Sequence, residues 1–193
     1  MKLIDITRTV QQAPVYPGSA PPVITRVTDI DKGDMYNYSM ITMDSHAGTH
    51  CDAFSHFLQG EAGIDEMALS FYYGPCSVTT VPAETPVTRE LLVGKIEHTE
   101  RLVLHTGGAG YLTKCGAEYL VECGVFTVVT DAPSISPLDN EAELHKILLG
   151  AGIAVIENAI LDSVPDGDYI LSAFPIKLGG CDGAPVRAIL VSE

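Results

Sequence analysis

Short apolar runs separated by turn-forming residues recur along the whole chain of 193 residues. Runs of this length that are rich in β-branched and aromatic residues, and that are bounded by Gly, Pro, Asn or Asp, are typical of β-strands. The pattern predicts strands over residues 3–7, 23–30, 36–43, 77–81, 101–105, 125–130, 153–156, 169–173 and 186–191.

Helical signals are fewer. The clearest segment has Leu144, Ile147 and Leu148 on one apolar face at helical spacing. Asn140 lies three residues before Glu143, and this spacing predicts an N-terminal cap. Together the signals predict helices over residues 88–95, 113–123 and 140–149.

Length and composition fit one folded domain over residues 1–193. Strands outnumber helices and are interspersed with them, so we expect an α/β fold with a mixed sheet. Hydrophobic residues make up 46% of the chain, which excludes a disordered protein because enough apolar surface is available for a core.

The charge balance is strongly acidic, with 25 Asp and Glu residues, 11 Lys and Arg residues, and a net charge of −14. A nucleic-acid-binding surface needs clustered Lys and Arg, and an anionic membrane attracts the same residues, so both partners are excluded. One explanation of the excess is that some carboxylates hold cations.

The sequence carries no sign of export or of a membrane span. The segment 1–10 contains Asp5 and no apolar run of signal-peptide length, and no stretch approaches 18 uncharged apolar residues. The five cysteines are odd in number and include no CxxC pair, which fits neither a disulfide framework nor a zinc ribbon. We therefore expect a cytoplasmic protein with reduced thiols.

A histidine cluster is the strongest chemical signal. His46, His50 and His56 lie within eleven residues, together with Asp52, and imidazole and carboxylate are common ligands of divalent ions. The bare HxxxHxD spacing also occurs without metal. Because Gly48 is unfavourable in a helix, we expect a turn after the strand 36–43 that leads into an extended segment.

The complete string, HxGTHxDxxxH, resembles the signature of the cyclase family of metal-dependent hydrolases, which includes bacterial kynurenine formamidase and isatin hydrolase. The resemblance covers nearly the whole chain. Its further parts, in family order, are Tyr16-Pro17-Gly18, residues 131–134, the helix with His145, residues 152–158, and residues 166–187.

The resemblance implies a role for each matched residue. A first metal would be bound by His46, His50 and Asp52. Asp52 and Glu157 would bridge to a second metal, which His145 completes. By the same resemblance, His56 is the proton donor and acceptor and Tyr16 contacts the substrate. It also implies a swivelling β/β/α fold, a homo-oligomer (dimer or tetramer) in which neighbouring subunits complete the pocket, and two divalent ions, zinc or manganese.

The chemistry of these residue types agrees with the implied roles. A divalent metal lowers the pKa of a bound water to about 7, which makes a nucleophile available at neutral pH. A histidine with a pKa near 6.5 can then protonate the leaving amine. Glu157 follows the apolar run 153–156, where an unpaired charge is costly. We expect a hydrolase that cleaves a C–N bond in a small amide, formamide or cyclic amide.

The sequence departs from the family pattern around the substrate. Phe54 stands where the family string usually has Pro, while Tyr16 and Ser19 stand where kynurenine formamidases usually have Trp and Asp. The altered positions leave two alternatives open. One is a metal-dependent lyase or cyclase that acts on a small carbonyl substrate, and the other is a metal-binding protein without catalysis. The presence of His56 speaks against the second, because pure metal storage does not need it.

Other candidate motifs have simpler interpretations. Cys51 lies between two predicted ligands and, on an extended segment, should point away from both. His105 precedes the Gly-rich segment 106–110, which lacks the spacing of a phosphate loop and is expected to be a turn. A Ser/His/Asp triad is excluded for want of a GxSxG elbow.

Overall fold

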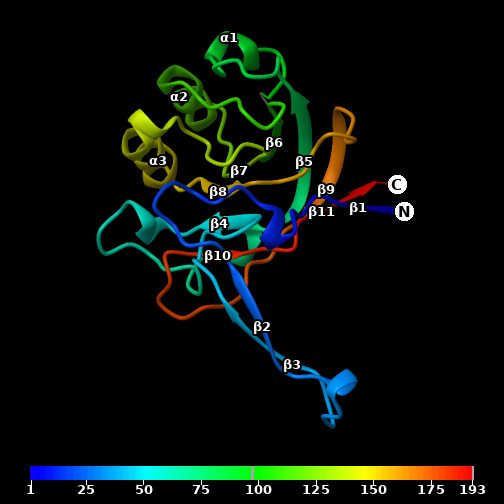
Figure 1. Cartoon of the computed structure of the whole chain (residues 1–193). Helices are drawn as coiled ribbons and strands as arrows, with labels where there is room; N and C mark the ends of the chain where they lie inside the picture. Colours follow the sequence, from blue (N-terminus) through cyan, green and yellow to red (C-terminus); the bar gives the residue numbers. More distant parts are fainter. Residues whose placement is uncertain (97, 193) are drawn as a thin grey trace.

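A mixed sheet of nine strands forms the centre of the computed structural model, which describes residues 1–96 and 98–192 (Figure 1). The strand order is β1-β11-β9-β5-β6-β7-β8-β4-β10, in which the neighbours from β5 to β8 run parallel and all other neighbours run antiparallel. The strands span β1 Lys2–Asp5, β4 His50–Asp52, β5 Tyr73–Thr80, β6 Arg101–His105, β7 Thr127–Thr130, β8 Ala154–Glu157, β9 Gly167–Ser172, β10 Gly183–Pro185 and β11 Ile189–Ser192.

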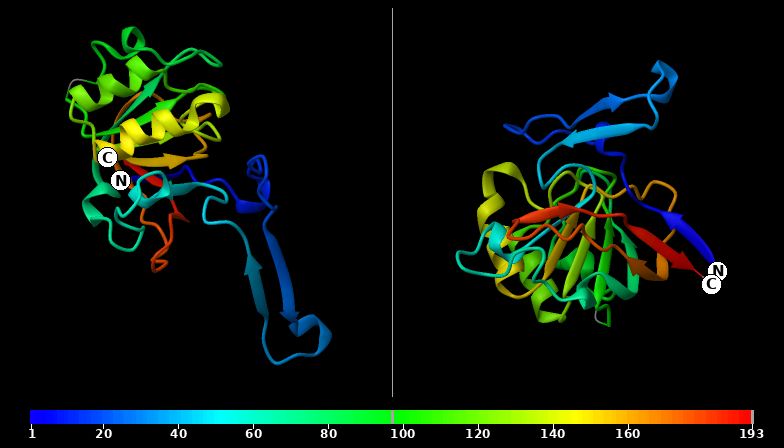
Figure 2. Two further views of the ribbon diagram at one scale, coloured as in Figure 1. Left: turned by 90° about the vertical axis from the view of Figure 1, so that its left-hand side faces the viewer. Right: turned by 90° about the horizontal axis from the view of Figure 1, so that it is seen from below.

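Three α-helices cover one face of the parallel strands: α1 Arg89–Leu92, α2 Lys114–Glu122 and α3 Glu141–Gly150 (Figure 2). Alternate residues of each parallel strand enter two different cores. On β6, for example, Leu102 and Leu104 pack under the helices, whereas Val103 packs on the other side. The parallel strands read as continuous apolar runs in the sequence because both of their faces are buried. The expected α/β fold with a mixed sheet is confirmed.

Two element predictions are wrong. The run 186–191 is not one strand, because the chain changes partners there: β10 pairs with β4, whereas β11 pairs with β1 and β9. The helix expected over 88–95 is the single turn α1, which ends before Gly94 at a left-handed φ of +80°.

The predicted cap of α3 is also absent. Asn140 precedes the helix, but its side chain makes no capping bond to the backbone. The chain already turns before α3, in a 3₁₀ segment over Leu138–Asn140, and the Asn140 side chain contacts the Glu143 carboxylate instead. The acidic first turn, with Glu141 and Glu143, still complements the helix dipole.

The strands β2 (Val23–Thr28) and β3 (Tyr38–Thr42) form a separate hairpin that projects away from the main body (Figure 2). We call residues 23–42 the arm. Its large apolar side chains are exposed along the strands and at the tip, namely Val23, Ile24, Val27, Ile30, Met35, Tyr36, Tyr38, Met40 and Ile41. Within the described residues, no helix is long and apolar enough to cross a membrane.

Thr49 joins three parts of the chain directly beside β4. Its buried hydroxyl accepts a hydrogen bond from the Arg8 backbone N–H at 2.7 Å and donates to the Asn158 carbonyl at 2.7 Å. The N-terminal segment, the start of β4 and the end of β8 are therefore fixed together by one hydroxyl group.

We predict that Thr49→Val lowers the free energy of unfolding by about 2–3 kcal/mol, because two buried backbone groups lose their partner. Thr49→Ser keeps the hydroxyl and serves as the matched control, with an expected loss below about 1 kcal/mol. Denaturant unfolding measures both values. A loss in Thr49→Val no larger than the loss in Thr49→Ser would show that the two hydrogen bonds contribute no more to stability than the methyl group does.

Candidate metal centre

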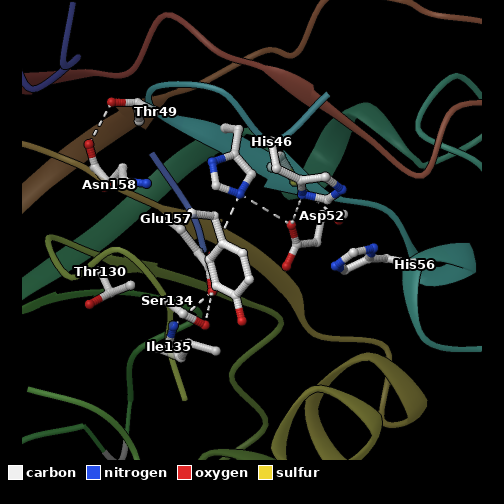
Figure 3. Close-up of polar contacts among 12 residues, drawn as sticks. His46, Thr49, Asp52, His56, Thr130, Ser134, Ile135, Glu157 and Asn158 are labelled. Carbon is white, nitrogen blue, oxygen red and sulfur yellow. Dashed lines mark hydrogen bonds and ion pairs between the residues drawn. The ribbon is translucent and has the colours of Figure 1, made fainter. Parts of the chain in front are cut away.

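The fold brings all five predicted metal ligands into one cluster, in which Figure 3 labels His46, Asp52 and Glu157. His50 and Asp52 lie on β4, and His50 pairs in register with Glu157 at the end of the neighbouring strand β8. The remaining two ligands come from other segments: His46 from the turn before β4, and His145 from α3.

Two glycines make room for the turn that carries His46. Gly48 adopts a left-handed φ of +71°, and a Cβ there would lie 3.3 Å from the Val10 Cα atom. On β10, a Cβ at Gly183 would lie 2.8 Å from Cε1 of His46. The expected turn followed by an extended segment is confirmed, and larger residues at either glycine would displace it.

Asp52 is at the centre of the cluster and is fully buried. Its Oδ1 atom lies 3.0 Å from Nδ1 of His46 and 3.5 Å from Nε2 of His50. Its Oδ2 atom lies 3.4 Å from Nε2 of His145 but has no hydrogen-bond partner in the described residues. An unsatisfied buried carboxylate oxygen is costly unless a cation or a proton accompanies it.

The rings of His50 and His145 are oriented by backbone carbonyls. Nδ1 of His50 lies 3.0 Å from the Gly48 oxygen, and Nδ1 of His145 lies 2.9 Å from the Glu141 oxygen. Because a carbonyl only accepts, each Nδ1 carries the proton and donates it. A neutral ring then directs the lone pair of Nε2 toward the carboxylates, which is the arrangement that second-sphere contacts give to metal-binding histidines.

When both rings are neutral, as metal ligands have to be, the cluster is made of acceptors that face acceptors. The two Nε2 atoms lie 3.3–3.5 Å from oxygens of Asp52 and Glu157. Two sets of three residues have ligand atoms within 4.8 Å of one another: His46, Asp52 and His56, and His50, Asp52 and Glu157. Asp52 belongs to both sets. This donor set fits a divalent cation.

The electrostatic field of the cluster favours positive charge. Protons on the rings can also balance the carboxylates: burial lowers the pKa of His145, but its contacts with Asp52 and Glu157 and their charges outweigh burial and raise the pKa to about 11. His46 follows the same pattern, and its pKa rises to about 9. Burial raises the pKa of Asp52, yet its contacts with His145 and His46 and the charges of the neighbouring histidines hold it well below its usual range.

Glu157 is also held by the segment that follows β7. Its Oε1 atom accepts hydrogen bonds from the Ile135 backbone N–H at 2.7 Å and from the Ser134 hydroxyl at 3.2 Å (Figure 3). Its Oε2 atom lies 3.5 Å from Nε2 of His50. The carboxylate of Glu157, buried at the end of an apolar strand, therefore has specific protein partners.

His56 lies at the edge of the cluster, in a 3₁₀ turn after β4. Its ring centroid is 4.1 Å from that of His46, and its Nδ1 lies 3.3 Å from Oδ2 of Asp182. Burial lowers the pKa of His56, in contrast to the three histidines inside the cluster. The residue predicted to exchange protons is therefore the one that the environment keeps neutral most readily.

Asp182 is a site residue that the sequence did not single out. Its Oδ2 contacts His56 and also lies 3.2 Å from Nε2 of His46, while its Oδ1 accepts from the Ser45 hydroxyl. Its sequence signals were its place in the matched segment 166–187 and its position before Gly183, whose close approach to His46 the sequence does not reveal.

A cavity of about 530 Å³ opens beside the cluster and is lined by His46, His50, His56, His145 and Glu157. Tyr16 lines it too, and its hydroxyl donates to Oε2 of Glu141 at 2.7 Å. Proline and aliphatic side chains make up much of the remaining wall. The size and the apolar lining suit a small organic molecule.

The simpler interpretations of two other motifs are confirmed. Cys51 points into the core, and burial raises the pKa of its thiol well above the usual value. The Gly-rich segment after His105 is a turn whose Thr106 and Gly108 N–H groups donate to the carboxylate of Asp131. These amides are already engaged, so they are not free to bind a phosphate.

Comparison with known proteins agrees with this geometry. Kynurenine formamidase of Bacillus cytotoxicus is 34% identical over 97% of this chain and 96% of its own length. A solved structure described as a potential metal-dependent hydrolase with cyclase activity is 29% identical, with a TM-score of 0.84 over 98% of this chain and 96% of that one.

Isatin hydrolase A from Labrenzia aggregata shares the fold, with a TM-score of 0.85, 21% identity, and coverage of 100% of this chain and 94% of its own. The Cyclase family model matches residues 4–137, which include the turn with Tyr16 and the complete histidine motif. The chain belongs to the cyclase family.

Proposed function

We propose that the protein is a metal-dependent hydrolase that cleaves the C–N bond of a small amide, formamide or cyclic amide. The observation that carries the proposal is the convergence of four histidines and Glu157 on one wall of an apolar cavity, with the buried Asp52 in contact with three of these histidines. Kynurenine formamidase among the relatives supports amide chemistry, with an arylformamide as the nearest substrate type.

We assign His46, His50 and Asp52 to one divalent ion, and Asp52, Glu157 and His145 to a second. Nitrogen and carboxylate donors suit zinc or manganese. Such ions, when bound, polarise an amide carbonyl and activate a water for attack on it. The contacts of Asp52 with His46, His50 and His145 support its place between the two ions.

His56 supplies the proton that the leaving nitrogen needs. Its Nδ1 faces the carboxylate of Asp182, so the neutral ring carries its proton there and leaves Nε2 as the base. Nε2 can then take a proton and return it to the leaving amine. Asp182 positions the ring, and the apolar cavity wall excludes competing water from the reacting bond.

We predict that His56→Ala lowers kcat at least about a hundredfold, which is the usual contribution of a general acid and base. Metal content should stay near that of the wild type because the five assigned ligands remain. Hydrolysis of N-formylkynurenine and of isatin, followed by absorbance, measures the loss. Undiminished turnover in the variant would show that His56 does not transfer the proton. If the wild-type protein hydrolysed neither substrate, the lyase alternative would be favoured.

We predict that Asp52→Asn loses most of the bound metal, because Asp52 is assigned to both ions. His105→Gln, outside the cluster, is the control and should bind as much metal as the wild type. Elemental analysis after metal supplementation and removal of free metal gives the stoichiometry. Less than one equivalent in the wild type would refute the metal centre.

We also propose that the chain forms a homo-oligomer, a dimer or tetramer, through the arm. Apolar residues lie on both faces of the hairpin: Ile24 pairs with Ile41 on one face, and Met40 lies on the other. A two-stranded hairpin with both faces in water is marginally stable. Val15 and Leu138, at the cavity, are exposed as well and offer an apolar surface to the arm of a second copy.

We predict that Tyr38→Glu combined with Met40→Glu converts the oligomer to a monomer, because charges would be buried in the contact. Arg26→Ala, on the same strand pair, is the control and should leave the mass unchanged. Sedimentation or light scattering gives the mass. A monomeric wild type at tens of micromolar would contradict the proposal.

For location, we propose the cytoplasm. All five cysteines are free thiols, and two of them, Cys51 and Cys76, are buried. Unpaired thiols suit a reducing compartment, and this observation supports the proposal.

A further inference from the structure

Phe57 lies between the cavity of the metal centre and a second hollow, a groove of about 610 Å³ on the surface. Among the described residues, Phe57 is the one that lines both spaces. The other walls of the groove include Phe54 and Leu149 and the exposed charged residues Glu61 and Lys146. Removal of the Phe57 side chain would therefore open the groove onto the metal centre.

The Phe57 ring contacts two histidines of the site. It stacks on the imidazole of His145, with ring centroids 4.6 Å apart and an interplanar angle of 24°. It meets the imidazole of His56 edge-on, at a centroid distance of 4.4 Å and an angle of 75°. One apolar side chain thus touches both an assigned metal ligand and the assigned proton carrier.

The backbone fixes the position of Phe57 relative to His56. The two residues are consecutive, and Phe57 ends the 3₁₀ turn Phe54–His56 by donating its N–H to the Phe54 carbonyl. The Phe54 ring packs edge-to-face on Phe71, with 5.6 Å between centroids, and this contact holds the start of the turn against the core. The ring of Phe57 is therefore presented to the histidines by an anchored turn.

The stack restrains His145 in a direction that its polar contacts leave free. Nδ1 donates to the Glu141 carbonyl at 2.9 Å, and Nε2 lies 3.4 Å from Asp52 and 3.3 Å from Glu157. These contacts lie in the plane of the imidazole and hold its two nitrogens. Packing of the flat Phe57 ring on one face opposes tilting of the imidazole out of that plane.

Resting on the proposed function, we propose that Phe57 is a positioning residue of the active site. Its ring holds the imidazoles of His145 and His56 in their orientations and closes the wall between the cavity and the groove. Groups that orient metal ligands change metal affinity or activity by about ten- to a hundredfold, and the apolar shell of a metal site controls the access of solvent. Phe57 acts through the two histidines.

The first test is the release of zinc from loaded protein to an excess of a chromophoric chelator. We expect Phe57→Ala to release zinc at least about tenfold faster than the wild type, because His145 loses its restraint and the groove opens onto the site. Phe57→Tyr keeps the ring and should release zinc at a rate within about twofold of the wild type.

Phe126→Ala is the matched control for the loss of one aromatic ring, because the Phe126 ring packs against Phe71 and Arg101. Its rate of release should stay within about twofold of the wild type. If Phe57→Ala does not fold, Phe57→Leu takes its place, with an expected acceleration of at least about threefold. Release from the Phe57 variant that is no faster than from the wild type, or no faster than from Phe126→Ala, would overturn the inference.

Steady-state kinetics give a second readout. For hydrolysis of N-formylkynurenine we expect Phe57→Ala to lower kcat at least about tenfold and to change KM less than about twofold, because the ring acts through the histidines. Phe57→Tyr should recover most of kcat. A raised KM with an unchanged kcat would identify Phe57 as a substrate contact alone and would overturn the positioning role.

The two readouts separate this inference from the proposed function. Faster zinc release from Phe57→Ala, in a protein that hydrolyses no amide, would refute the hydrolase and retain the role of Phe57 at the metal centre. Hydrolysis by the wild type, with zinc release and kcat both unchanged in Phe57→Ala, would retain the hydrolase and refute the inference.

Discussion

Two buried carboxylates that share one small space are the constraint on which the site depends. Asp52 and Glu157 are both nearly inaccessible to water, and each raises the cost of charge on the other. Folding must therefore surround them with compensating groups, and His50 and His145 lie within 3.5 Å of both. A cluster of this kind is poor as a stabilising ion pair, because burial of charge costs more than the pairing returns. It is well suited to a divalent ion, which supplies two charges in one place.

The sheet topology explains why such a cluster can form from distant segments. β4 inserts beside β8 in antiparallel register, and this pairing places His50 opposite Glu157 without any long side chain having to reach. The histidines are then oriented by backbone carbonyls, which are fixed by the turn at Gly48 and by the first turn of α3. The main chain therefore sets the positions of the ligand side chains. Few rotatable side-chain bonds have to be fixed, so the loss of side-chain conformational entropy is small.

Much of this site was predictable from the chain. The HxGTHxD string joins residues whose proximity is local, and extended geometry alone places His50 and Asp52 on one face. His145 and Glu157 came from family order, since no spacing rule connects them to the motif. Asp182 could not be found, because its contact depends on β10 lying next to β4, a pairing between segments more than 120 residues apart.

The strand predictions likewise succeeded where the signal is local and failed where the outcome depends on distant segments. The parallel strands were predicted correctly because a strand that is buried on both faces has a continuous apolar run in its sequence. Only residues 189–191 of the predicted run 186–191 lie in a strand, because the chain changes sheet partners between β10 and β11, and a local pattern contains no information on partners. The arm was predicted as two strands, but its projection into solvent follows from what it does not contact, which no local pattern records.

The side chains at the rim of the cavity are less restricted by their contacts than those at its floor. The metal-centre residues form the floor. They contact shared carboxylates there, so a change of one residue affects its neighbours. At the rim, Tyr16 and Glu141 satisfy each other by one hydrogen bond, and other pairs of side chains could fill the same space. Glu141 nevertheless belongs to both regions, since its backbone orients His145 while its side chain faces the substrate space. The backbone contribution is independent of residue type, so the side chain at this position is free to vary with substrate while the metal centre stays the same.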